Sequence, residues 1–265
     1  MKDITFVGEM YNFRRSEDWV SNARPGFGAS YTDMAGEVVA GNTFDYPSIH
    51  GKAMLSAGYA FCSCSNERFE EDASVYADAW AIDLICGKQI TTPVGMHTRY
   101  TVFNKAIQNS INNFVSKGGN IFVSGSYIGT DLKDRIYPVD RDSTACVKVS
   151  DFAEDVLGYR FVTGQAGRRG TVKPVANRAL SGLENLRFET DRSPDIYCVE
   201  SPDGIAPANA DGQTICRYSD SGISAGVAYQ GKGYKAVSLG FPIETLKEEA
   251  LISNVIRTIL EYFKK

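Results

Sequence analysis

The hydrophobic residues of this 265-residue chain follow two spacings that alternate along its length. Short apolar runs of strand length occupy residues 3–7, 58–65, 80–86 and 235–239, and another follows Gly118-Gly119. Helical spacing of apolar residues covers 49–57, 67–79, 100–117 and 151–157, and returns between Leu251 and Phe263. Strands that alternate with helices predict an α/β protein with a mostly parallel sheet covered on both faces.

The clearest local pattern is a helix that runs into a strand and then a turn. Residues 100–117 place their apolar side chains on one helical face, and Gly118-Gly119 ends that helix. The buried strand that follows ends at Gly125-Ser126. In α/β proteins such a turn lies at the carboxyl edge of the sheet, where nucleophiles and ligands are presented.

Two regions lack this regular pattern. Residues 9–46 interleave aromatic rings with glycines and predict loops, whereas 161–234 carry turn signals and short β-like runs at 170–175, 196–200, 214–218 and 225–229. We expect a single domain over 1–265, with an aromatic-rich loop region at 1–50 and a β-rich extension at about 160–234. Thr245 and Glu248 have the spacing of a capping box for the last helix.

Composition and charge exclude several classes of partner. The formal charge of −4 predicts no nucleic acid, and no apolar stretch is long enough to insert into a membrane. The first residues resemble a strand and lack the apolar segment of a signal peptide, so the sequence suggests either a cytoplasmic protein or a fragment of a longer one. The six cysteines and two histidines lack metal-ligand spacing, so we predict no metal and no cofactor.

Two stretches carry a resemblance to a known family. Residues 118–131 (GGNIFVSGSYIGTD) and 231–245 (GKGYKAVSLGFPIET), with the closing helix, resemble class I glutamine amidotransferase-like domains. More narrowly, they resemble the domain near the end of Bacteroidetes proteins labelled xanthan lyase. Ser65-Asn66-Glu67 and residues 83–89 fit the same picture. The resemblance implies a flavodoxin-like three-layer sandwich with a β-rich insertion, in a periplasmic or extracellular protein.

The resemblance also locates a candidate active site. The family uses a cysteine at the turn after a central strand, with a histidine and a glutamate after a later strand. Ser126 stands at the position of the cysteine and Phe241 at that of the histidine, while Glu244 remains near the position of the acid. This pattern predicts a catalytically inactive module. A serine hydrolase with His97 or His50 recruited as the base is the alternative, and the family label adds a polysaccharide lyase.

The candidate ligand-binding residues come from the aromatic opening and from the turn after the strand at 58–65. They are Trp19, Arg24, Tyr46, Asn66 and Glu67. Aromatic rings on loops stack against sugars, although the same rings also pack over a core or against a neighbouring domain. Arg168-Arg169 suits either contact with an anionic sugar or an exposed hairpin tip. The expected partners are therefore a polysaccharide or neighbouring domains of a longer protein.

Overall fold

The computed structural model describes residues 2–4, 46–90, 92–94, 97–99, 101–132, 136–138, 146–176, 179–191 and 196–265. The helices are α3 (Tyr46–Ser56), α4 (Asn66–Glu71), α5 (Lys105–Ser116), α6 (Val149–Phe152), which continues as the π-helix η4 (Ala153–Leu157), and α7 (Glu249–Lys264). The described residues also form three short 3-10 helices, η2 (Ala73–Tyr76), η3 (Thr130–Leu132) and η5 (Ile243–Thr245).

Nine strands form one sheet in the order β11-β10-β13-β14-β15-β6-β3-β1-β2. They are β1 (Lys2–Ile4), β2 (Cys62–Cys64), β3 (Ala81–Gly87), β6 (Asn120–Gly125), β10 (Thr171–Pro174), β11 (Leu186–Arg187), β13 (Gly212–Tyr218), β14 (Ser224–Gln230) and β15 (Lys235–Leu239). Three two-stranded sheets pair β4 (Thr92–Val94) with β5 (His97–Arg99), β7 (Ile136–Pro138) with β8 (Cys146–Lys148), and β9 (Tyr159–Thr163) with β12 (Gly204–Pro207).

One half of the large sheet is parallel. Its strands lie in the order β2-β1-β3-β6-β15, and every neighbouring pair among them runs in the same direction. Counted along the chain, this order is 2-1-3-4-5, the order of the flavodoxin-like doubly wound fold. The predicted α/β class is thus confirmed, and the carboxyl ends of β3, β6 and β15 meet at one edge.

The other half of the sheet is antiparallel, so the sheet as a whole is mixed. The four pairs that join β15, β14, β13, β10 and β11 are all antiparallel, against four parallel pairs in the first half. The prediction of a mostly parallel sheet is therefore not confirmed. The physical reason is that β10, β11, β13 and β14 of the β-rich segment extend the sheet from the edge of β15, whereas β9 and β12 form a two-stranded sheet of their own.

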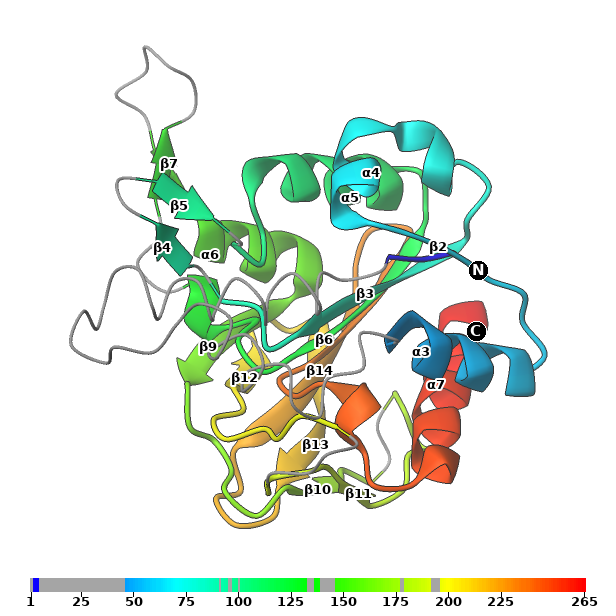
Figure 1. The fold of residues 1–265 in the computed structure, drawn as a ribbon, viewed down its shortest axis with the longest axis vertical. Coiled ribbons are helices and arrows are strands. Elements are labelled where there is room, and N and C mark those ends of the chain that lie inside the picture. Colours follow the sequence, from blue (N-terminus) through cyan, green and yellow to red (C-terminus); the bar gives the residue numbers. More distant parts are fainter. Residues whose placement is uncertain are drawn as a thin grey trace, which may run out of the picture.

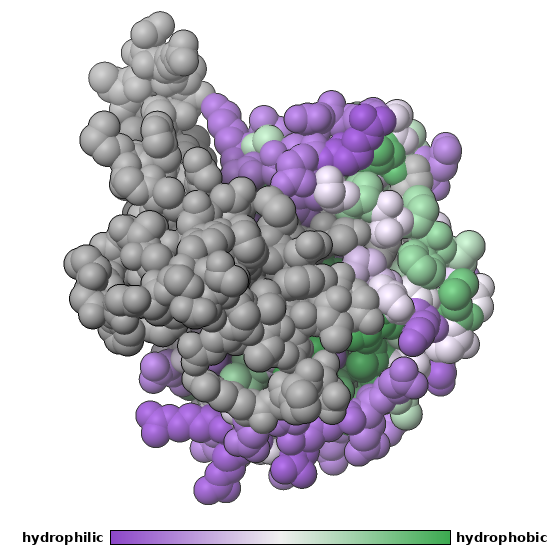
Figure 2. All heavy atoms as spheres, in the orientation of Figure 1, coloured by the Kyte–Doolittle hydropathy of each residue, from purple (hydrophilic) through white to green (hydrophobic). Residues whose placement is uncertain are grey.

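Helices cover both faces of the parallel half (Figure 1). Because side chains alternate along β3, Ala81 and Ile85 face a core cluster shared with α3 and α7, whereas Ile82 and Leu84 face a second cluster shared with α4 and α5. Figure 2 shows hydrophilic residues along the upper edge and along the lower edge over β10, β11 and β13, and a mixture of hydrophobic and hydrophilic residues on the right-hand side. Among the described residues, the large hydrophobic side chains that remain exposed are Leu55 and Val162.

Three local predictions differ from the structure. Residues 196–200 form no strand, and the predicted helix over 67–79 is interrupted at Asp72, which ends α4 and whose side chain caps η2. The capping box is also wrong, because α7 starts only after Glu248, which makes no capping hydrogen bond with its side chain. The Thr245 hydroxyl instead donates to the carbonyl of Pro242 within η5.

Gly240, directly after β15, is where the two halves of the sheet are joined most tightly. Its carbonyl accepts from the amide of Asp203, and its amide donates to Ala225. A Cβ atom at this position would lie 2.1 Å from the backbone oxygen of Asp203, so only glycine fits without a backbone shift.

We expect Gly240→Ala to lower the free energy of unfolding by about 2–3 kcal/mol, because the added methyl group meets backbone and not a movable side chain. Urea unfolding followed by circular dichroism measures this change. Gly182→Ala is the control, since its Cβ would lie no closer than 3.3 Å to Thr258. Equal stability of the two variants would contradict this close approach.

Candidate functional site

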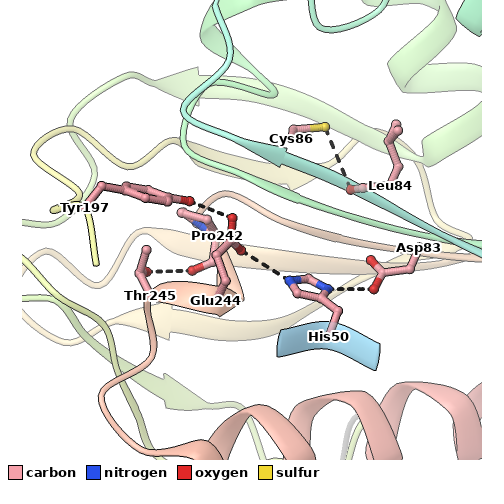
Figure 3. Close-up of polar contacts among 8 residues, drawn as sticks. All are labelled: His50, Asp83, Leu84, Cys86, Tyr197, Pro242, Glu244 and Thr245. Atoms are coloured by element: carbon pink, nitrogen blue, oxygen red, sulfur yellow. Dashed lines mark hydrogen bonds and ion pairs between the residues drawn. The ribbon is translucent and has the colours of Figure 1, made fainter. Parts of the chain in front are cut away.

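A buried histidine lies at the centre of the candidate site. His50 is on α3, where Tyr46, Ala53 and Met54 share its helical face and are also buried. Its Nδ1 atom lies 2.6 Å from Asp83 Oδ2, and its Nε2 atom lies 3.3 Å from Glu244 Oε2 (Figure 3). All three side chains are almost fully removed from solvent.

The first carboxylate comes from the middle of a central strand. Asp83 stands on β3 beside Phe122 of β6 and interrupts an otherwise apolar run. Its position in the alternation turns it toward the same face as Ile85, where α3 packs. A carboxylate at such a position is stabilised only when a buried partner is present, and here the imidazole of His50 fills that role.

The second carboxylate follows β15. Glu244 lies in η5, and its Oε1 atom accepts a 2.6 Å hydrogen bond from the hydroxyl of Tyr197. The ring of Tyr197 in turn meets that of Tyr46 edge-on, with 5.4 Å between centroids. The site is therefore a continuous buried network, Asp83–His50–Glu244–Tyr197, supplied by three elements and one loop.

Electrostatics favour the charged form of the histidine. Burial by itself lowers the pKa of His50, but the charge and hydrogen bond of Asp83, followed by those of Glu244, raise it to about 10. The ring is thus an imidazolium throughout the neutral pH range. Both nitrogens carry protons that point at carboxylates, so neither nitrogen is available to accept a proton.

Ser126 lies at the same edge of the sheet, in a segment (residues 125–130) that we call the elbow. Its amide donates to the carbonyl of Gly87 at the end of β3, and a Cβ atom at Gly87 would lie 3.6 Å from Glu244 Oε1. The Ser126 side chain is 1% exposed, and its hydroxyl has no hydrogen-bond partner among the described residues. Among the described residues, none is therefore placed to act as its general base.

The rest of the elbow is held by Asp203. One carboxylate oxygen of Asp203 accepts from the amides of Gly129 (2.6 Å) and Thr130 (2.7 Å), and the other accepts from the Thr130 hydroxyl. Burial raises the pKa of Asp203 to about 7, although these hydrogen bonds act in the opposite direction. Tyr159 adds a bond from its hydroxyl to the carbonyl of Ile128. The elbow is consequently fixed from the antiparallel side.

Phe241, which the sequence resemblance places at the position of the amidotransferase histidine, is a core residue. It is fully buried, stacks on Phe188 at 5.3 Å between centroids, and meets Tyr218 edge-on. The imidazole next to Glu244 therefore comes from α3 and not from the segment after β15. Cys86 lies on the opposite face of β3 from Asp83 (Figure 3), and burial raises the pKa of its thiol well above the ordinary value.

The other predicted site residues are dispersed. Tyr46 is 2% exposed, so its ring contacts Tyr197 and not solvent. Asn66 is buried at the start of α4, while Glu67 in the same turn is exposed. His97 belongs to β5, but its side chain lies outside what the structure describes, and Trp19 and Arg24 lie outside the described residues altogether.

Sequence reasoning missed Asp83 and Tyr197. Asp83 left a signal, because a charged residue inside an apolar strand requires a buried partner. The sequence also indicated a role for His50, because this residue lies on the apolar face of its helix, four residues after Tyr46 and three residues before Ala53. Nothing in the sequence pattern indicated a role for Tyr197, because its segment forms neither helix nor strand.

The described residues offer neither a metal site nor a membrane-spanning helix. No group of three or more histidine, cysteine, aspartate or glutamate side chains is arranged to hold a metal ion there. None of the helices in the described ranges combines the length and the apolar character needed to cross a bilayer.

Comparisons with known proteins identify the fold alone. No protein-family model and no curated protein matches the sequence. Among solved structures, the cold-adapted β-galactosidase of Rahnella sp. R3 matches with a TM-score of 0.54 and 14% identity, over 99% of this chain and 31% of that one. The exo-β-1,4-mannosidase Op5Man5 of Opitutaceae bacterium strain TAV5 gives 0.51 and 10%, over 98% and 36%. This chain thus spans about a third of each glycosidase.

The solved structures also include a putative GMP synthase protein of Thermoplasma acidophilum, with a TM-score of 0.48 and 10% identity, over 83% of this chain and 90% of that one. The narrower resemblance to proteins labelled xanthan lyase finds no support among them.

The buried imidazolium predicts a pH-dependent stability. The pKa of His50 is about 10 in the folded protein and about 6.5 when unfolded. Its contribution is therefore complete below the unfolded value and lost as pH rises through the folded one. Between about pH 7.5 and 8.5 the free energy of unfolding should fall by up to about 1.4 kcal/mol per pH unit.

Urea unfolding at a series of pH values measures this slope, and His50→Gln is the matched variant. We expect the variant to be less stable at neutral pH, because it leaves two buried carboxylates without their cation. We also expect its slope in this window to be shallower than that of the parent protein, because the contribution of His50 is removed. Identical slopes in the two proteins would show that His50 does not change its protonation on unfolding.

Proposed function

We propose that this chain is a catalytically inactive module of amidotransferase-like fold. In this proposal it belongs to a polysaccharide-handling protein of the cell envelope or the cell exterior. Its role there is to bind glycan or to contact a neighbouring domain. The proposal concerns a region of a longer protein, as the glycosidases of similar fold are about three times its length.

One observation carries the proposal: both nitrogens of His50 face carboxylates. A serine hydroxyl becomes a nucleophile at neutral pH only when a neighbouring base accepts its proton. An imidazolium held between Asp83 and Glu244 cannot accept one, and Phe241 replaces the histidine of the related family. The network therefore supports a structural role for what is a reactive centre in amidotransferases.

The polysaccharide context rests on the comparisons and not on the buried network. Two of the structures that this chain matches over nearly its whole length are named as a β-galactosidase and a β-mannosidase. The match covers only about a third of each, so we infer a shared module and not a shared reaction. Fold likeness at this level of identity gives an association and not a mechanism.

Replacing Ser126 by alanine tests the inactive centre. We expect Ser126→Ala and the parent protein to give the same background rate with glutamine and with a p-nitrophenyl ester, because no base activates the hydroxyl. Ser124→Ala is the matched control, since Ser124 is equally buried and its hydroxyl also has no partner among the described residues. Turnover that is lost in Ser126→Ala but kept in Ser124→Ala would establish a hydrolase and end the proposal.

The alternative of a lyase and the binding role are tested on one glycan panel. Release of unsaturated uronates, followed by ultraviolet absorbance, would contradict an inactive module. We expect no such release and expect at least one glycan to raise Tm. If no glycan changes Tm, the role in glycan binding is overturned. Contact with a neighbouring domain then remains as the proposed role.

A further inference from the structure

The outer face of the antiparallel half carries an unusual arrangement of cations. Lys173 on β10 stands directly opposite Arg217 on β13. Arg187 on β11 pairs with Thr171 and is therefore the diagonal neighbour of Lys173. All three cations are exposed, whereas the alternate residues Val172, Leu186, Cys216 and Tyr218 face the core and are buried.

This arrangement is unfavourable for folding. Like charges directly opposite each other on an antiparallel pair are destabilising. No carboxylate of the described residues forms an ion pair with Lys173, Arg187 or Arg217, and the nearby Glu189 is instead paired with Lys247 at 3.0 Å. The Arg217 guanidinium donates to the carbonyl of Gly222, which does not neutralise it.

The loop that precedes β10 adds two more cations. Arg168 and Arg169 are exposed, and their backbone amides donate to the carboxylate of Asp220 at 2.7 and 3.3 Å. These bonds fix the loop beside the hairpin between β13 and β14. We call Arg168, Arg169, Lys173, Arg187 and Arg217 the basic face; β10, β11 and β13 lie along the lower edge in Figures 1 and 2.

We propose that the basic face binds a polysaccharide that carries carboxylate groups, such as a polyuronate. This inference rests on the proposed function and names the class of glycan. A chain with carboxylates at regular intervals complements cations that repeat across neighbouring strands. Such binding accounts for a repulsive pair on the surface of a protein whose net charge is −4.

Nucleic acid fits the same face less well. Proteins that bind single strands stack bases on exposed aromatic rings, and Leu55 and Val162 are the large hydrophobic side chains exposed in the described part of the chain. Proteins that bind duplexes are strongly basic over the whole domain, whereas this chain is acidic.

The test is the affinity for polygalacturonate, measured by isothermal titration calorimetry at low and at physiological salt. We expect binding that weakens with salt, and a loss of about tenfold in the variant K173Q/R187Q/R217Q. The matched control is K52Q/K117Q/K232Q, which removes the same charge from other surfaces and should bind like the parent protein. The double variant K173Q/R187Q preserves the bond from Arg217 to Gly222 and should still bind more weakly.

Stability gives an independent readout. Because Lys173 and Arg217 repel each other, we expect Lys173→Gln to raise Tm by about 1–2 °C while it weakens binding. Lys52→Gln should leave both unchanged. A fall in Tm for Lys173→Gln would contradict the repulsion on which the inference is built.

Several results would overturn the inference. They are absence of binding to polygalacturonate, equal weakening by the two triple variants, and equal affinity for duplex DNA or for neutral dextran. If a neutral glycan binds but polygalacturonate does not, the basic face is excluded while the proposed function stands. Hydrolysis that depends on Ser126 would instead exclude the inactive module and leave binding at the basic face intact.

Discussion

The structure depends on a positive charge placed where no water reaches it. His50 is held between two carboxylates, and the three groups come from α3, β3 and η5. Ions in such surroundings are tolerated only when partners and hydrogen bonds compensate for their lost hydration. The three elements are therefore not free to shift independently, since any displacement would leave a charge uncompensated. The network fixes α3 against the carboxyl edge of the sheet.

The same contacts are the basis of the proposed structural role of this centre. A catalytic histidine needs one nitrogen oriented by an acid and the other facing the reacting group. Here an acid faces each nitrogen, and Tyr197 adds a further hydrogen bond to Glu244. These contacts make the carboxyl edge of the sheet rigid. The elbow is anchored at the same edge by its hydrogen bonds to Asp203. As a chemical consequence, the imidazole has no free lone pair with which to accept a proton.

The sequence predicted what depends on periodicity and missed what depends on distant contacts. The spacing of apolar residues located α5 and α7, which each bury one face against the sheet, and β6 and β15, which are buried within it. The turn signals of 161–234 predicted strands there, some of them antiparallel, but left open whether these strands extend the sheet or form a small β layer, since that depends on which edge a hairpin joins. The turn at Gly125-Ser126 was predicted from the strand pattern, and Glu244 was found through family resemblance. Their connection to His50 was not, because the histidine comes from a different segment.

The position of β15 has a consequence for how the chain folds. β15 pairs with β6, yet Lys235 and Asn120 are separated by 115 positions, and the antiparallel hairpins lie between them in sequence. The hairpins that join β13 to β14 and β14 to β15 are local and close quickly, whereas joining β15 to β6 requires closing a long loop. His50 and Glu244 are 194 positions apart. The antiparallel half is therefore expected to form early in refolding, and desolvation of the imidazolium late, as the step that completes the native state.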